Sequence, residues 1–350
     1  MGTGSGPDPA SGAAREPGER RITIADVAAR AGVSKSAVSF VFNGRRGLSE
    51  GTTDRIVRAA RDLGWRPSSR ARALSGQRPR TAGLVLRRDA AAASSDLVGF
   101  LHGIGSALAA TGAVLVVRVV ATDAEEREAY SAFAREAQVD VVLLAGLRVA
   151  DDRPAALARL GLPFVSADSV GAADQGARMR QAIRHLAGIG HRRIALVADE
   201  SLARSARWSA EFARESRLLG LDARVAWVSL SIPITVRDAT AGLLDRAEPP
   251  TGIVYESDVL AAAGMQAALR RGLEVPHELS VIALDDGPVA LVTNPALSVV
   301  RRDAEAWGRA CGRLLANSGG GSPEDALPPA ELIMRGSTAP PSPSNQERSR

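Results

Sequence analysis

Residues 23–43 have the sequence TIADVAARAGVSKSAVSFVFN, and this stretch predicts two short helices joined by a tight turn. Ile24 and Val27 recur at the spacing of one helix face. Gly32 can adopt the positive φ that such a turn requires. Ser34 stands where a hydroxyl caps the N-terminus of the second helix. We therefore expect a helix-turn-helix in this part of the chain.

The second predicted helix, residues 35–42, has two different faces. The apolar face should pack inward and consists of Val38, Val41 and Phe42. The opposite face carries Lys35, Ser36, Ser39 and Phe40. Small polar side chains at a helix N-terminus fit the major groove of DNA. Two interpretations of Phe40 stay open, because its ring either faces such a groove or turns inward beside its apolar neighbours.

A third helix is predicted from about Glu50 to Leu63, with Ser49 as its cap. The charge around these helices is lopsided. Residues 1–80 hold fifteen Lys and Arg and seven Asp and Glu, a net charge of +8, whereas the whole chain is +5 and the remainder is therefore −3. A basic N-terminal block ahead of a mildly acidic body indicates a nucleic-acid-binding domain attached to a ligand-binding or oligomerisation domain.

At 350 residues the chain is long enough for two or three domains. No apolar run reaches about 18 residues, so no membrane span is expected. Residues 1–20 lack the apolar segment of a secretory signal, and the single cysteine, Cys311, excludes an internal disulfide. These features predict a cytoplasmic bacterial protein. Low-complexity composition predicts disordered tails at residues 1–20 and 338–350.

From Thr81 the pattern changes to short apolar runs that alternate with helical stretches. The runs are residues 83–86, 114–120, 139–145, 163–167, 193–197, 225–229, 252–255 and 279–284. Because they are apolar throughout, they are typical of strands covered on both faces. The predicted fold is an N-terminal all-α helix-turn-helix domain at 21–67, a linker at 68–80, and an α/β body at 81–337. The body should hold two doubly wound parallel-sheet subdomains.

The stretch 23–43 resembles the signature T-x-x-D-V-A-x-x-A-G-V-S-x-x-T-V-S-x-V-x-N of the lactose-repressor-type (LacI/GalR) family of bacterial transcriptional regulators, with Ala37 in place of the usual Thr. The body resembles the family's effector domain, which has the periplasmic-binding-protein fold, through GHRRIA at 190–195, LSVIALDD at 279–286 and PALSV at 295–299. The resemblance implies a ligand-responsive repressor that binds a pseudo-palindromic double-stranded DNA operator as a homodimer. It also implies control by a small, sugar-like molecule.

The resemblance implies roles for single residues of the DNA-binding domain and the linker. Bases would be read by Lys35, Ser36 and Phe40, and phosphates would be bound by Thr23, Ser34, Ser39, Asn43 and Ser49. In the family the segment that corresponds to residues 68–76 folds into a hinge helix on DNA. Its Leu, here Leu74, enters the minor groove between the central base pairs. The alternative hypothesis, a small-molecule-binding protein without operator binding, needs no such segment.

Ligands of open parallel sheets bind beyond the carboxyl ends of the strands. Carboxylates at those ends suit a polyhydroxyl ligand, because each accepts two hydroxyl hydrogen bonds. The predicted effector-binding residues, supported by the family resemblance, are Asp168, Arg207, Ser257, Asp258 and Asp285. Ser257 stands where the family usually has Asn, which weakens the case for a typical sugar. Some strand-end carboxylates, Asp199 above all, are expected to cap the following helix instead.

No catalytic constellation is expected. Residues 47–51, GLSEG, match the hydrolase pattern G-x-S-x-G but lie in a loop of the DNA-binding domain, where no buried strand precedes them. Lys35, the only lysine, follows no glycine run, so no phosphate-binding Walker loop exists. The four histidines have no metal-ligand spacing, and neither a metal nor a cofactor is predicted. His185 and His191 should pack around the turn at Gly190.

Overall fold

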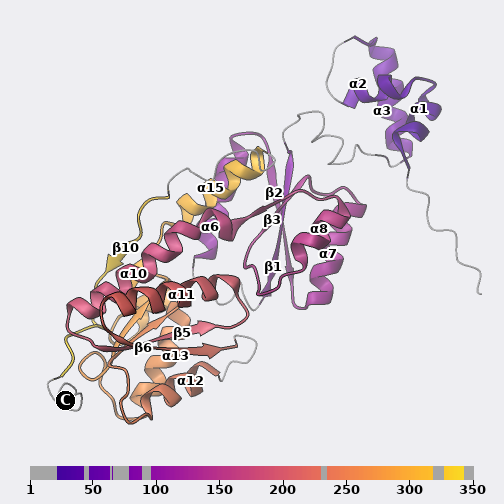
Figure 1. Ribbon diagram of the computed structural model, residues 1–350. Coiled ribbons are helices and arrows are strands. Elements are labelled where there is room, and N and C mark those ends of the chain that lie inside the picture. The colour runs from indigo at the N-terminus through magenta and orange to yellow at the C-terminus, as the bar shows by residue number, and fades with distance from the viewer. Residues whose placement is uncertain are drawn as a thin grey trace, which may run out of the picture. The chain divides into compact units, whose positions relative to one another are not determined.

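The computed structural model describes residues 22–42, 47–63, 65, 79–88, 96–229, 235–317 and 327–342 (Figure 1). The chain divides after Ser68 into two compact units. We call them the head and the body and describe each by itself. Asn43 and Leu74 lie outside the described residues, as do both predicted tails except residues 338–342.

The head consists of α1 (Ile24–Ala31), α2 (Lys35–Phe42) and α3 (Glu50–Asp62). Gly32 ends α1 in the left-handed conformation, with φ of 64°, and so makes the tight turn that the sequence predicts. One fully buried residue from each helix, Val27, Val38 and Ile56, forms the centre of a small core. The helix-turn-helix and its third packing helix are therefore confirmed.

The N-terminal subdomain of the body is a four-stranded parallel sheet with the order β2-β1-β3-β4. Its strands are β1 (Thr81–Arg87), β2 (Val114–Val120), β3 (Val141–Leu144) and β4 (Phe164–Ser166). One face packs against α6 (Leu97–Ala109) and α15 (Ala304–Ala316), and the other against α7 (Asp123–Arg135) and α8 (Arg153–Leu160). Each face carries its own apolar cluster, as expected for a doubly wound sheet.

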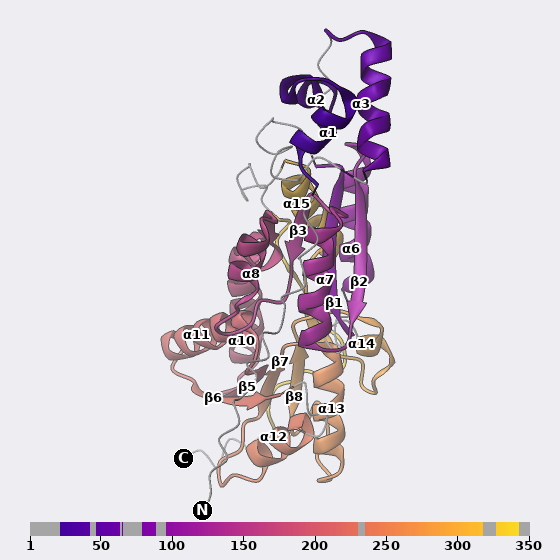
Figure 2. The same cartoon turned by 90° about the vertical axis from the view of Figure 1, so that its right-hand side faces the viewer.

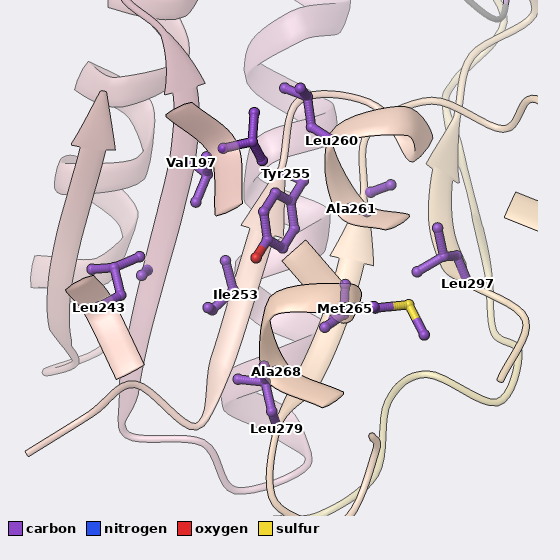
Figure 3. Close-up of a cluster of buried hydrophobic side chains, with 14 of the residues drawn as sticks. Val197, Leu243, Ile253, Tyr255, Leu260, Ala261, Met265, Ala268, Leu279 and Leu297 are labelled. Atoms are coloured by element: carbon purple, nitrogen blue, oxygen red, sulfur yellow. The ribbon is translucent and has the colours of Figure 1, made fainter. Parts of the chain in front are cut away.

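The C-terminal subdomain is a six-stranded sheet with the order β10-β9-β8-β7-β5-β6, in which β10 alone runs antiparallel to its neighbour. Its strands are β5 (Arg193–Asp199), β6 (Asp222–Val228), β7 (Gly252–Tyr255), β8 (Ser280–Ala283), β9 (Ser298–Arg301) and β10 (Glu331–Ile333). The helices are α10 (Ala172–Gly188), α11 (Ala203–Leu218), α12 (Thr235–Leu244), α13 (Asp258–Leu269) and α14 (Pro288–Val292), whereas the short α9 (Ala167–Val170) packs in the core of the N-terminal subdomain. Side chains of α12 and α13 meet those of the strands in the apolar cluster of Figure 3.

The chain passes between the subdomains after β4, after β9 and after α15. Both subdomains are therefore built from segments far apart in sequence. The eight predicted strands are all present, whereas β9 and β10 were not predicted. The edge strands β2 and β6 are half exposed, so the expectation of cover on both faces is wrong for them. Among the described residues, no helix has both the length and the apolar character needed to cross a bilayer.

The predicted C-terminal tail is wrong for residues 338–342, which belong to the body. The Ala339 carbonyl oxygen lies 3.1 Å from Nε2 of His191 and accepts a hydrogen bond from the Ser280 hydroxyl at 3.0 Å. His185 similarly contacts the Thr338 hydroxyl at 3.1 Å. The expected packing of both histidines around the Gly190 turn is confirmed. The same two histidines also bind residues 338–339 of the C-terminal segment. Composition could not reveal the pairing, because its partners lie about 150 residues earlier in the chain.

Helices α6 and α15 touch backbone to backbone at glycines. A Cβ at Gly103 would lie 2.1 Å from the carbonyl oxygen of Glu305, and one at Gly308 would lie 2.1 Å from that of Phe100. We expect Gly103→Ala to lower the free energy of unfolding by about 1–3 kcal/mol or more, because the two helices must move apart. Urea unfolding measures this. Gly105→Ala is the matched control, since nothing lies within 4 Å of its Cβ position and the change should stabilise α6 by roughly 0.5–1 kcal/mol. Equal effects of the two substitutions would contradict the close packing.

Candidate nucleic-acid interface and effector cleft

The face of α2 opposite the core carries the residues predicted to read bases. Lys35 and Ser36 are exposed, Ser39 is half-buried, and Phe40 is 37% exposed, whereas Val38 between them is fully buried. The apolar neighbours Val41 and Phe42 pack in the head core, and Phe40 does not. The expected division of α2 into an apolar inner face and an outer face is thus confirmed. Phe40 lies on the outer face and does not turn inward.

Three residues predicted to bind phosphate lie at the N-termini of the three head helices. The Ser34 hydroxyl accepts a hydrogen bond from the Ala37 N–H at 3.1 Å, and the Ser49 hydroxyl accepts one from the Thr52 N–H at 3.3 Å. The Thr23 N–H and hydroxyl both donate to Asp26, at 2.8 and 2.7 Å. All three side chains are exposed. A helix N-terminus carries partial positive charge, so these positions suit an anionic group.

In the body the structure brings together Asp168 and Arg207. Asp168 is buried in the first turn of α9, and its carboxylate accepts the Leu147 N–H at 2.9 Å. Arg207, exposed on α11, donates from Nη1 to the Asp168 carbonyl oxygen at 3.4 Å. Asp168 therefore joins three segments: the loop after β3, the segment after β4 in which the chain passes to the other subdomain, and α11, which follows β5. This is the carboxyl edge of both sheets, where a cleft between subdomains is expected.

Ser257 and Asp258 act together at the start of α13. The Ser257 hydroxyl accepts the Leu260 N–H at 3.3 Å and so caps this helix. Asp258 has no exposed surface, and its carboxylate oxygens accept the N–H groups of Val259 and Ala290, at 2.9 and 3.3 Å. These two hydrogen bonds connect α14 to α13, and contact of Asp258 with an effector stays a prediction. Asp199 accepts from the Ser201 N–H and hydroxyl, in the turn before α11, so the expectation that it caps the following helix is wrong.

Asp285 lies in a cluster of charged groups that sequence reasoning missed. Its carboxylate accepts a hydrogen bond from Arg178 at 2.8 Å, and Arg178 is fully buried. Arg302 donates to Asp96 at 3.4 Å, and its guanidinium stacks 3.8 Å from the ring centroid of Trp307. One feature of the sequence could have indicated this cluster. Arg178 lies four and eight residues before Ala182 and Leu186, and a charged residue on such an apolar helix face needs a buried partner.

Burial raises the pKa of two carboxyl groups of the body. It raises the pKa of Asp96 to about 6, helped by the negative charge of Asp285 and opposed by Arg302. It also raises the pKa of Glu256, the residue after β7, to about 7, which Arg204 partly opposes. Perturbed titratable groups in a cleft are typical of ligand sites. Among the described residues, no group of acidic, His or Cys side chains is placed to hold a metal ion.

The comparisons with known proteins agree with this architecture. Residues 23–68 match the family model for bacterial regulatory proteins of the lacI family, and residues 183–338 match that for a periplasmic binding protein-like domain. The transcriptional regulator reg1 of Streptomyces lividans is 30% identical in an alignment 342 residues long that covers 90% of this chain and 96% of that protein. This chain belongs to the lacI family. It is therefore a transcriptional regulator with a DNA-binding helix-turn-helix, and not an enzyme.

Two further relatives are similar over most of this lacI-family chain. The transcriptional regulator MalR of Streptomyces coelicolor is 31% identical over 341 residues, covering 90% of this chain and 96% of that protein. A solved complex of the regulator CelR with cellobiose is 26% identical with a TM-score of 0.64. It covers 91% of this chain and all of the CelR chain. The head and the two-subdomain body of this regulator thus occur together in its relatives.

Proposed function

We propose that this lacI-family regulator is a repressor that binds a pseudo-palindromic operator as a homodimer and responds to a small molecule in the cleft of the body. The observation that supports operator binding is the exposed face of α2, the second helix of the helix-turn-helix. This face presents Lys35, Ser36 and Phe40. A helix of this kind reads base edges in the major groove. Phosphates are bound by Thr23, Ser34, Ser39, Asn43 and Ser49.

Exposed apolar side chains of the body support the homodimer. Val119 of β2 is 63% exposed, Val98 of α6 is 80% exposed and Val292 of α14 is 80% exposed. In Figure 2, α6 and β2 lie at the right edge of the N-terminal subdomain and α14 at the right edge of the C-terminal subdomain. Burial of these side chains against a second copy removes apolar surface from water. A two-fold dimer then sets the spacing of the two operator half-sites.

The effector binds between the subdomains, at Asp168, Arg207, Ser257 and Asp285. A sugar-like molecule fits these groups, because carboxylates accept hydroxyl hydrogen bonds and a guanidinium donates them to ring and hydroxyl oxygens. The similarity to CelR, whose solved complex contains cellobiose, supports this chemical class. Binding changes operator affinity only as far as the effector prefers one arrangement of the subdomains over another.

Selection of binding sites from random DNA by the full chain tests this function. We expect enrichment of one sequence made of two inverted half-sites at a fixed spacing. A thermal-shift screen with cellobiose, maltose and nucleosides then tests the effector class in the same preparation. Stabilisation by a screened molecule without any enriched DNA sequence would instead support a binding protein that does not bind an operator.

Substitution of the linker residue Leu74 tests whether its side chain inserts as an apolar wedge between base pairs of the minor groove. We expect Leu74→Ala to weaken operator binding by a few kcal/mol, because an apolar wedge permits the closer contacts of kinked DNA. Binding to random DNA and thermal stability should not change. Fluorescence anisotropy with operator and with random DNA of equal length measures both affinities, and Ser75→Ala is the neighbouring control. Equal losses on the two DNAs would show that Leu74 is not a wedge.

A further inference from the structure

β6 is the edge strand of the six-stranded sheet. In the part of the chain that the structure describes, it pairs with β5 alone, along its whole length. The Asp222 N–H donates to the Arg192 carbonyl oxygen and the Val228 carbonyl oxygen accepts from the Glu200 N–H, both at 2.9 Å. Because successive residues of a strand direct their backbone groups to opposite sides, the even-numbered residues of β6 face β5. The residues whose N–H and carbonyl groups point away from the sheet are therefore Ala223, Val225 and Trp227.

This edge has few of the features that keep a strand from pairing with another chain. Proteins protect their sheet edges with proline, lysine, bulges or very short strands. β6 is seven residues long, pairs with β5 without a bulge and contains neither proline nor lysine. Its two charged residues, Asp222 and Arg224, pair with each other at 2.9 Å. No hydrogen bond from a described residue reaches the outward backbone groups. An added strand can therefore bind here.

Apolar side chains are exposed at both ends of this edge. Ala223 and Val225 pack against the apolar cluster to which α10 and α11 contribute. Side chains two residues apart lie on the same face of a strand, so Trp227 lies on this face as well, and it is 45% exposed. At the other end of the strand, Leu218 and Leu219 at the end of α11 are 69% and 42% exposed. An edge with outward backbone groups and exposed apolar side chains is the kind of surface that binds an added strand.

A second copy of β6 fits this edge in one register. Two copies related by a two-fold axis pair antiparallel, and every outward group of one strand meets an outward group of the other only when Val225 lies opposite the partner's Val225. Ala223 then lies opposite the partner's Trp227, so the largest side chain of the edge meets the smallest. On the other face Arg224 lies opposite the partner's Ala226, so like charges do not meet. The edge is thus complementary to itself in backbone groups, in side-chain size and in charge.

We propose that β6 is an interaction surface for a second copy of this chain, which continues the six-stranded sheet across two copies. In Figure 2, β6 and α11 lie at the left of the C-terminal subdomain, whereas α14, part of the surface assigned above to the homodimer, lies at its right. In the sheet, β5 and β7 separate β6 from β8, the strand before α14. The two surfaces can therefore be occupied at once, and together they give a tetramer. The β6 contact itself requires neither DNA nor effector.

Sedimentation velocity of the full chain without DNA tests this contact. Val225→Pro removes the outward N–H at the centre of the pairing, and an edge strand tolerates proline where its N–H side faces solvent. Val225→Ala shortens the side chain but keeps the N–H, and it is the matched control. Each lost hydrogen bond weakens an association about two- to tenfold, and both copies lose one. We therefore expect the dissociation constant of the β6 contact to be about four- to a hundredfold higher for Val225→Pro than for Val225→Ala.

A disulfide tests the register and covers the case that the proline variant does not fold. In the proposed pairing Val225→Cys places its sulfur opposite the same residue of the partner, with about 5.5 Å between the Cα atoms. Ala223→Cys is the control, because the two copies of that residue would lie about 13 Å apart along the strands. The native Cys311 is buried and its thiol pKa is raised to about 12, so it does not compete. On mild oxidation we expect a covalent dimer of Val225→Cys, reversed by reduction, and none of Ala223→Cys.

Mass and cross-linking separate the β6 contact from the homodimer proposed above. With both surfaces in use, the wild type forms tetramers and Val225→Pro forms dimers; with β6 alone in use, the two form dimers and monomers. Equal masses of Val225→Pro and the wild type at every concentration from about 1 to 100 µM overturn the β6 contact. Equal cross-linking of Val225→Cys and Ala223→Cys overturns its register. A wild-type mass that is not a whole multiple of 36.4 kDa would show a different protein on this edge and would also overturn the proposal.

Discussion

Operator affinity is expected to fall by about three to five orders of magnitude when salt is raised from roughly 50 to 200 mM, as for a protein with about six to ten phosphate contacts. The net charge of +8 in residues 1–80 and the three exposed helix N-termini of each head are the reason. Each contact neutralises a phosphate and releases condensed cations from the DNA. The slope of log K against log salt should therefore be about −0.9 per contact.

Fluorescence anisotropy with a labelled operator over a series of KCl concentrations measures this slope. Arg58→Gln, on the exposed surface of α3, should make the slope less negative only if that residue contacts phosphate. Arg270→Gln, at the end of α13 in the mildly acidic body, is the matched control and should leave the slope unchanged. A flat dependence for the wild-type chain would exclude the head as the DNA-binding surface.

The sequence predicts the head almost completely because its signals are local. Turn, caps and core residues lie within a few positions of the groups they act on, as Gly32, Ser34 and Ser49 show. The strands of the body are predicted equally well where they are central and apolar. β9 and β10 were not predicted, because the polar residues Ser298 and Arg301 in β9 and Glu331 in β10 leave only two apolar residues in each strand. The edge strands β2 and β6 have the same composition as covered strands, so composition cannot reveal their exposure.

The cleft is predicted only in outline. Position at a strand end identifies Asp168, Asp258 and Asp285, but the same position suits a helix cap as well as a ligand contact. In the structure Ser257 caps α13, whereas the Asp258 carboxylate accepts the N–H of Ala290, 32 residues later. The Arg178–Asp285 pair spans 107 residues, and no spacing rule reaches that far. Contacts with residues far along the chain decide which strand-end carboxylates remain available to bind a ligand. These contacts are set by the tertiary fold.

For Phe40 the sequence left two orientations open, and the structure favours the one in which the ring lies on the outer face of α2. Its ring is 37% exposed beside the exposed Lys35 and Ser36, and a Cβ placed on Gly47 would lie 3.9 Å from it. The ring therefore lies on the face of α2 that should meet the major groove, near the loop that follows. Phenylalanine has no hydrogen-bond donor, so it favours the methyl group of thymine over guanine at the base it meets.

Phe40→Arg is therefore expected to shift the preferred base from T·A toward G·C at one position of each half-site. Arg can donate two hydrogen bonds to O6 and N7 of guanine, which is worth about 1–3 kcal/mol per half-site and roughly twice that for a dimer on two half-sites. Site selection from random DNA by both proteins, followed by titration of the matched operators, measures the shift. Phe40→Leu, which is apolar and also lacks a donor, should keep the T·A preference. Identical consensus sequences for the wild-type and Arg proteins would mean that Phe40 reads no base and that Lys35 and Ser36 carry the specificity of α2.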